Sequence, residues 1–228
     1  MKHLQFLSLV CMITITCFSC KKSTDSTDSG NPVNWSEELR NTLWSGTFKY
    51  VSGVNQSLQP FSLLLMDNGI ITWADADGER SVGNWKVDGN QINFIFPNST
   101  TISATLAKDK WSNLKSGIGT AISIDHIASA VRPDVSLLEN STWVGAFNGS
   151  PFTVKFNIIN YVELTGISYT YYSGKYTVSL AGIRCTRDEP QFKGYYYGIF
   201  QNGNTELNSF LHFISPASDR YIYWIAKK

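Results

Sequence analysis

Apolar and polar residues alternate with a period of two along most of the chain, which is the pattern of a β-strand with one buried face. From Trp44 to Tyr50 every second residue is aromatic or glycine, and the residues between them are Ser, Thr and Lys. From Phe152 to Ile158 apolar residues alternate with Thr, Lys and Asn in the same way. The pattern predicts an all-β chain with almost no helix.

Tight turns separate these runs, because Asx-Gly dipeptides supply the positive φ that two-residue hairpins require. They stand at 68–69, 77–78, 88–89, 148–149 and 202–203. In the second half of the chain we expect strands at 142–147, 151–158, 161–167, 169–180, 182–186, 191–198, 207–213 and 220–226. The helical signal is a turn over 34–39, where Asn34 is a candidate cap and Glu37 follows in the first turn.

One segment of the sequence, which we call the repeated phrase, occurs twice in the chain. LRNTLWSGTF at 39–48 returns as LENSTWVGAF at 138–147, with the Leu, Asn, Trp, Gly and Phe positions identical. After a shift of 91 residues, PFSLLLMD at 60 aligns with PFTVKFNI at 151, and GNWKV at 83 aligns with GKYTV at 174. Several matches in the same order indicate an internal duplication. We therefore expect two modules, at 34–133 and 134–228.

Each module should be an antiparallel meander of about eight short strands, and closing a meander into a barrel removes its exposed edges. Two tandem barrels are the first prediction, and one larger barrel or sandwich shared by both halves is the alternative. The interior of a small barrel is filled by side chains. The residues expected inside are Trp44, Phe48, Phe61, Trp85, Phe94, Trp143, Phe147, Phe156 and Tyr176. Loops, a barrel mouth or the seam between the modules are therefore the expected places for a ligand.

The order of these motifs resembles a known family. Trp-x-Gly-x-Phe, an apolar strand, Gly-x-Trp/Tyr-x-Val and Ile-x-Phe/Cys follow one another in both copies, as in the lipocalin-like (calycin-like) repeat modules of Gram-negative envelope lipoproteins. The resemblance covers most of residues 39–228. It implies β-barrels and ligand binding, with a carrier of a small hydrophobic ligand as an alternative function, and it brings no catalytic residues.

The N-terminus has the features of an export signal. Lys2 precedes an apolar stretch from Leu4 to Phe18, which is too short to cross a bilayer. Residues 1–19 resemble a bacterial lipoprotein signal cleaved before Cys20, and the resemblance implies that Cys20 carries lipid. Residues 20–33 are polar and of low complexity, which is typical of a flexible tether. We expect a lipid-anchored protein of the bacterial envelope, on the periplasmic or cell-surface side of the outer membrane.

Charge and cysteine content narrow the range of partners. Lys and Arg number 19 against 18 Asp and Glu, and loss of Lys2 with the signal leaves 18 of each. A balanced charge without a basic run argues against nucleic acid as a partner. Only Cys185 remains in the folded part, so no internal disulfide is expected. It aligns with Phe94, which predicts a buried, inert thiol on an inward face.

The sequence contains no recognisable pattern of catalytic or metal-binding residues. His126 and His212 have no metal-ligand spacing around them. The DADGE segment at 75–79 lacks the third oxygen position and the closing Glu of a calcium loop, and a hairpin turn explains it better. The pair Asp188 and Glu189 precedes Pro190 and is expected in a solvated turn. We expect no metal, no cofactor and no catalysis, with an enzymatic site in the seam between modules as the alternative.

The second module has an unusual density of aromatic residues, mostly tyrosines in three strands. Because neighbours in a strand point opposite ways, an inward Tyr196 places Tyr195 and Tyr197 outward, against solvent, the other module or a partner. Outward rings suit flat partners such as sugar faces or proteins. Tyr171, Tyr172 and Tyr196 are therefore candidate ligand-binding residues for a glycan or protein partner. Cross-strand ring pairs that stiffen the sheet are the alternative.

Overall fold

The computed structural model describes residues 33–228 except 54–55, 98–99, 118, 158–160, 167–169 and 190–191. For residues 137, 161, 170–172, 187–189 and 192 only the backbone is described. The predicted signal, Cys20 and nearly all of the tether lie outside this part. Residues 34–228 form one compact unit. Within the described chain, no helix has the length and apolar character to span a membrane.

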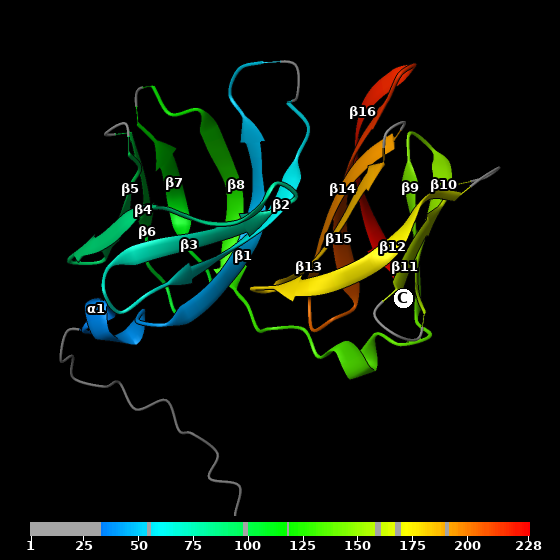
Figure 1. Ribbon diagram of the computed structural model, residues 1–228. Helices are drawn as coiled ribbons and strands as arrows, with labels where there is room; N and C mark the ends of the chain where they lie inside the picture. The colour runs from blue at the N-terminus through cyan, green and yellow to red at the C-terminus, as the bar shows by residue number, and fades with distance from the viewer. Residues whose placement is uncertain are drawn as a thin grey trace, which may run out of the picture. The chain divides into compact units, whose positions relative to one another are not determined.

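The first half of the chain forms an antiparallel sheet of eight strands, with neighbours in the order β7-β6-β5-β4-β3-β2-β1-β8 (Figure 1). A short helix, α1 (Trp35–Glu38), precedes it. The strands are β1 (Thr42–Tyr50), β2 (Gln59–Leu65), β3 (Ile70–Asp75), β4 (Gly78–Asp88), β5 (Gln91–Ile95), β6 (Thr101–Thr105), β7 (Ser112–Ser116) and β8 (Ile122–Ser129).

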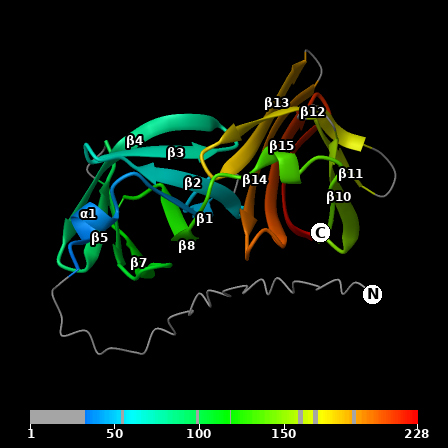
Figure 2. The same cartoon turned by 90° about the horizontal axis from the view of Figure 1, so that it is seen from below.

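The second half forms a closed barrel, and Figure 2 labels its strands β10 to β15. The remaining strands complete it, because β9 pairs with both β10 and β16. A 3-10 turn, η1 (Val135–Leu137), leads into it. The strands are β9 (Thr142–Phe147), β10 (Ser150–Asn157), β11 (Tyr161–Thr165), β12 (Thr170–Ser179), β13 (Gly182–Glu189), β14 (Phe192–Gln201), β15 (Glu206–Ser215) and β16 (Ser218–Lys227).

The first sheet curls toward closure through a short contact rather than a full ladder. Residues before β7 reach β8, where Trp111 N–H donates to Ile127 O (3.3 Å) and Ser129 N–H donates to Asp109 O (2.9 Å). Lys110 and Ala128 form an isolated bridge between them. We call the two barrel-like sheets the first and the second barrel.

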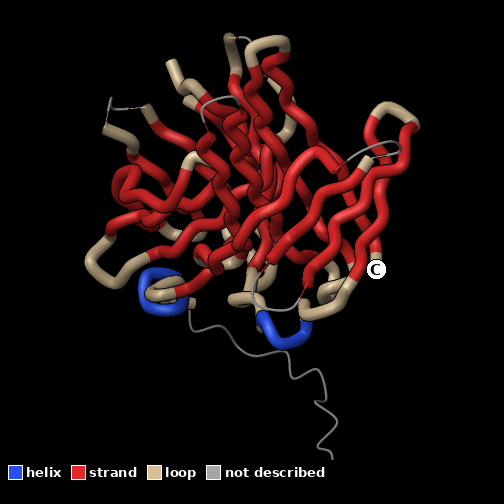
Figure 3. The backbone as a smooth tube through the Cα atoms, turned by 45° about the vertical axis from the view of Figure 1, so that its right-hand side comes forward, coloured by secondary structure: helices blue, strands red, loops and turns tan. Residues whose placement is uncertain are grey.

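The predicted fold class is confirmed, because strands make up most of the described chain (Figure 3). They pair as two tandem eight-stranded meanders. Two local predictions are wrong. The Asn34 side chain makes no cap hydrogen bond to α1; its backbone carbonyl accepts from Glu37 and Glu38 instead. Asp188 and Glu189 do not sit in a turn, because β13 continues through them and pairs with the start of β14.

The repeated phrase builds the same local structure twice. Asn41 (φ 56°) and Asn140 (φ 59°) both adopt the left-handed conformation that Asn tolerates. The buried Trp44 donates its indole N–H to Thr42 Oγ1 (2.8 Å), and Trp143 donates to Ser141 Oγ (3.0 Å). The shared hydroxyl therefore satisfies the one polar atom of each buried ring.

Gly46 and Gly145, the glycines of the repeated phrase, have the same role in the two barrels. A Cβ on Gly46 would lie 2.0 Å from His126 O, in β8, and one on Gly145 would lie 2.3 Å from Ile225 O, in β16. In each barrel the first strand meets the last strand at this point, and only a residue without a side chain lets the two backbones approach so closely. Glycine at this position is therefore a requirement of barrel closure.

Each barrel has its own aromatic core. The residues expected inside are buried in these cores, except Phe147, which is only partly buried against the second. Cys185 is buried in the core of the second barrel, which confirms its inward position. The aligned pairs Phe61 and Phe152, Trp85 and Tyr176, and Ile92 and Ile183 are all buried, as a duplicated packing pattern requires.

A third apolar cluster joins the outer faces of the two barrels. Outward rings of β14 to β16, including Tyr197 and Phe210, pack against small or aliphatic residues of the first barrel such as Ala74 and Leu64. The turn between β12 and β13 enters the same cluster with Leu180, which is buried although its φ is 51°. We call this contact the seam.

Candidate functional site

The first barrel has a pocket of about 260 Å³ at the end where β1 finishes. The helix α1 lies at the other end of this strand (Figure 1). Its main lining residues are Phe48, Tyr50, Trp73, Asp75, Arg80 and Phe96. They come together because β1, β3 and β5 end at this mouth and β4 begins there. The pocket is thus a barrel mouth with aromatic walls and one ion pair.

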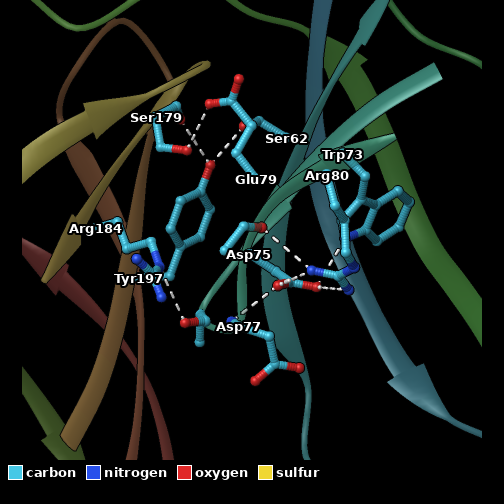
Figure 4. A network of polar contacts seen from close by, with 11 residues as sticks. Ser62, Trp73, Asp75, Asp77, Glu79, Arg80, Ser179, Arg184 and Tyr197 are labelled. Atoms are coloured by element: carbon cyan, nitrogen blue, oxygen red, sulfur yellow. Dashed lines mark hydrogen bonds and ion pairs between the residues drawn. The ribbon is translucent and has the colours of Figure 1, made fainter. Parts of the chain in front are cut away.

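Asp75 is the most constrained polar group of the pocket, with a side chain only 2% exposed. Its carboxylate accepts from Arg80 Nη1 (2.8 Å) and Nη2 (2.9 Å), from Trp73 Nε1 (2.8 Å) and from the backbone N–H of Asp77 (2.9 Å), as Figure 4 shows. Four donors on two oxygens satisfy the carboxylate fully. A buried charge is tolerated only when it is paired in this manner.

Arg80 is much more accessible to solvent than Asp75, since its side chain is 43% exposed. The hydrogen bond to Asp75 is the main cause that raises the pKa of the guanidinium above its ordinary value. Nη1 also donates to Gly78 O (3.2 Å). Within the described chain, Nε–H and the second hydrogen of Nη2 have no acceptor. Arg80 is therefore held firmly on one edge and open on another.

The aromatic rings of the pocket wall contact one another in a continuous series. Trp73 lies parallel to Phe61 at a centroid distance of 4.0 Å, and Phe48 meets the Trp73 ring edge-on at 5.4 Å. Tyr50 packs edge-on against Phe48 at 5.6 Å and is partly exposed. Such offset and edge-to-face contacts fix ring positions. The floor of the pocket is rigid, while Tyr50 and Phe96 form a partly exposed rim.

Two acidic residues, Asp75 and Asp77, influence the electrostatics around Tyr50 at the mouth. Burial raises the pKa of the Asp77 carboxyl, and the charge of Asp75 raises it further. Burial also raises the pKa of the Tyr50 hydroxyl, followed by the charges of Asp77 and then Asp75, each of which outweighs the opposing effect of Arg80. At the Tyr50 hydroxyl, the two acids therefore outweigh the Arg80 guanidinium.

The seam contains a buried polar network. Tyr197 donates its hydroxyl to Ser179 O (3.0 Å) and accepts from Ser62 Oγ of the first barrel (Figure 4). Ser62 Oγ in turn accepts from the backbone N–H of Ala181 (3.2 Å). Burial is the main cause that raises the pKa of Tyr197. The ring is fully buried, so its hydroxyl serves the contact between the barrels.

Further hydrogen bonds cross the seam at its edges. Ser179 Oγ donates to Glu79 Oε2 (3.0 Å), and Arg184 Nε donates to Ala76 O (3.2 Å). His126 Nε2 bonds Gln201 Nε2 across the seam (3.1 Å). Its Nδ1 bonds Thr47 Oγ1 within the first barrel (3.1 Å).

Of the tyrosines named from the sequence, Tyr196 lies outside this pocket. Tyr196 is fully buried in the second core, where its hydroxyl bonds Ser209 Oγ (3.1 Å) and burial raises its pKa. Its ring is thus not available to a partner at the surface. Tyr171 and Tyr172 belong to β12, and their side chains lie outside the described part, as does Cys20.

Sequence reasoning missed Asp75, Arg80 and Phe96 as a group. A signal for the first two was present, because Asp75 ends the strand before the predicted hairpin turn and Arg80 lies just inside the next strand. Opposite charges placed diagonally across a hairpin can pair. Phe96 reaches the mouth through the closure of the barrel, which no local pattern encodes.

The second barrel has a smaller pocket, of about 160 Å³, at the end where β9 begins. Trp143, Leu138, Phe200, Asp134, Asn204 and Lys228 line it. In terms of the duplication this is the opposite end from the first pocket. In the described chain, no group of three or more His, Cys, Asp or Glu residues is placed to hold a metal ion.

Comparisons with known proteins give few relatives. No family model matches the chain, and no curated protein matches it. A solved protein of unknown function from the DUF3598 family of Nostoc punctiforme PCC 73102 is similar over 85% of this chain and 97% of that chain, with 10% identity and a TM-score of 0.28. The N-terminal dehydratase from the difficidin assembly line covers 82% of this chain and 77% of its own, with 7% identity and a TM-score of 0.14. At these TM-scores neither likeness bears on the function of this chain.

Proposed function

We propose that the chain is a lipid-anchored protein of the bacterial envelope whose two lipocalin-like barrels act as a non-catalytic binding module. The ligand is taken at the mouth of the first barrel. The observation that carries this proposal is the aromatic pocket of about 260 Å³ with a half-exposed guanidinium at its side. Concave, mostly apolar pockets with a few fixed polar groups are the usual form of small-ligand sites.

One feature of the molecule favours binding over catalysis. The Asp75 carboxylate is engaged by Arg80 and Trp73, and the hydroxyls of Tyr197 and Ser62 are engaged with each other and with backbone groups. A catalytic acid or base needs a proton within reach of a substrate. The alternative of an enzymatic site in the seam therefore has less support than a binding site at the mouth.

A carrier that encloses its ligand has less support for a reason of size. Inward rings fill the barrels, among them the expected Phe156 and Tyr176 in the second core, which Trp224 joins. An eight-stranded barrel filled in this way has little internal volume. The mouth, where Tyr50 and Phe96 are partly exposed, is the more accessible place.

The site at the mouth is tested by a binding screen on the full chain, purified in detergent, against libraries of saccharides and lipids. Binding measured by thermal shift is expected to be lost in Phe96→Ala and retained in Phe200→Ala. The control residue is also a partly buried phenylalanine, but it lines the pocket of the second barrel. A ligand that binds equally to both variants, or no ligand from either library, would contradict the proposed site.

The anchor is tested separately. Metabolic labelling with a palmitate analogue is expected to mark the wild type and not Cys20→Ser. The variant is also expected to leave the detergent phase on phase separation, because one site of acylation supplies the membrane affinity. A Cys20→Ser protein that stays in the membrane fraction would contradict the lipid anchor without affecting the proposed binding site.

A further inference from the structure

Arg80 offers a ligand two parallel donors. The end of its guanidinium, Nη1 and Nη2, is occupied by the two oxygens of Asp75. The other edge, Nε–H and the outer hydrogen of Nη2, has no acceptor within the described chain and belongs to a residue that lines the pocket. An arginine edge of this type binds two neighbouring oxygen atoms at once. The ligand must therefore present a pair of adjacent acceptors.

Asp75 limits which ligands can use this edge. Both of its oxygens are filled by protein donors, so it offers no free acceptor to a ligand. Its role is to lock the guanidinium in one orientation before the ligand arrives, which lowers the entropy lost on binding. The pocket thus recognises acceptors on the ligand through a preorganised donor pair.

The charge balance decides between two kinds of acceptor pair, a carboxylate and two neighbouring hydroxyls. Asp75 neutralises Arg80, and Asp77 adds a second acid beside the mouth. The pKa of Tyr50, which lines the pocket, is raised by both acids more strongly than Arg80 lowers it. The acids that act on Tyr50 disfavour an anionic ligand beside this ring. Neutral hydroxyl oxygens fit the same donors without this repulsion.

The walls and the volume fit one ring. A pocket of about 260 Å³ lies just below the range of roughly 300 Å³ and more that drug-sized ligands occupy. Tyr50 and Phe96 give the rim apolar faces, and the Tyr50 hydroxyl has no partner within the described residues. A pyranose has both required features, since its C–H faces are apolar and its edges carry vicinal hydroxyls.

We propose that the mouth of the first barrel binds a neutral saccharide, whose vicinal hydroxyls accept from Nε and Nη2 of Arg80 and whose ring lies against Tyr50 and Phe96. This inference rests on the proposed function and specifies its ligand. It places the glycan partner in the first barrel and assigns no role to Tyr196.

The experiment measures binding of single probes to the full chain in detergent by saturation-transfer NMR and calorimetry. The probes are methyl glycosides of glucose, galactose, mannose, N-acetylglucosamine, fucose and xylose, with sodium glucuronate and palmitate for comparison. At least one glycoside is expected to bind, more tightly than glucuronate. Arg80→Lys keeps a cation for Asp75 but removes the second donor edge, and is expected to weaken glycoside binding by about tenfold or more.

Phe96→Ala is expected to weaken the same glycoside, and Phe200→Ala is expected to leave it unchanged. The circular dichroism spectrum of each variant establishes that it is folded. No binding of any glycoside, tighter binding of glucuronate, or equal affinity of Arg80→Lys would overturn the saccharide assignment. If glucuronate or palmitate then binds and Phe96→Ala weakens it, the proposed site stands and only the ligand class fails. If no probe depends on Phe96, the site itself fails as well.

Discussion

The two barrels contain the same repeated phrase, but their pockets lie at opposite ends. In the first barrel, Leu39 is buried and Trp35 packs against the core at the end where β1 begins, and the pocket lies at the other end. In the second barrel, β9 and β10 are joined by the tight turn at Asn148 and Gly149, and the pocket lies where β9 begins. The duplicated residues pair the first strand with the last in both copies. They do not fix the end at which each barrel has its pocket, because Leu138 and Trp143 line the second pocket while Leu39 is buried in the first core.

The outer faces differ as well, and the difference explains the aromatic density of the second barrel. Its outward rows carry large rings, such as Tyr197 and Tyr223, which face the first barrel in the shared apolar cluster. The first barrel contributes small residues there, including Ser62 and Ala74. Large residues on one face and small ones on the other allow close packing of the two sheets. The seam thus takes up outward rings, which the sequence had left open to contact with solvent, the other module or a partner.

The largest expected effect tests whether barrel closure is the same in both copies. Gly46→Ala and Gly145→Ala should each lower the free energy of unfolding by about 3 kcal/mol or more, because the added Cβ meets a backbone carbonyl that cannot move aside. Urea unfolding measures both. Ala146→Ser, at an exposed neighbouring position, is the control and should stay within about 0.5 kcal/mol of the wild type. A tolerated Gly145→Ala beside a damaging Gly46→Ala would show that the copies close differently.

The next prediction concerns the buried ion pair between Asp75 and Arg80, which belongs to the first barrel. Asp75→Asn should lower the free energy of unfolding by about 2 kcal/mol, since the amide removes the charge opposite Arg80 and turns a donor toward other donors. Asp77→Asn is the matched control. Its carboxylate is disfavoured by burial and by Asp75, so this change should be neutral or stabilising. Equal losses in the two variants, measured by urea unfolding, would contradict the assigned roles.

A smaller effect tests the seam. Tyr197→Phe keeps the ring but leaves Ser179 O without its donor and should cost about 1 kcal/mol of stability. Tyr195 lies on the same outward face of β14 and is the control, because Tyr195→Phe removes a partly exposed hydroxyl. Its stability should match the wild type within experimental error in the same urea titration. A neutral Tyr197→Phe would mean that apolar packing alone holds the barrels together.

The smallest effect concerns alkaline pH. Burial raises the pKa of Tyr223 from 10 to about 12 in the folded protein. The unfolded state therefore loses the proton first, and the stability contributed by this tyrosine is complete below about pH 10 and declines as the pH rises toward 12. Tyr223→Phe should flatten the decline of the thermal midpoint in this range. An identical decline in the variant would assign the alkaline loss to other groups.

Local patterns determined much of this protein. The two-residue period predicted the strands, the Asx-Gly dipeptides predicted the hairpins, and the repeated phrase predicted two similar barrels with buried tryptophans at Trp44 and Trp143. These features depend on residues that are adjacent in the sequence or that belong to the same hairpin. The sequence alone is therefore enough to predict them. Asn34 shows the limit even there, because a suitable cap residue need not use its side chain.

Only the tertiary structure decided where the outward rings go and where a pocket remains. Alternation placed Tyr197 on an outer face, but its partner Ser62 lies 135 residues away in the sequence, and nothing local identifies it. Asp75, Arg80 and Phe96 meet because a curled sheet brings the ends of separate strands to one mouth. Burial and empty volume are properties of the closed chain, since each depends on contacts between residues distant in sequence.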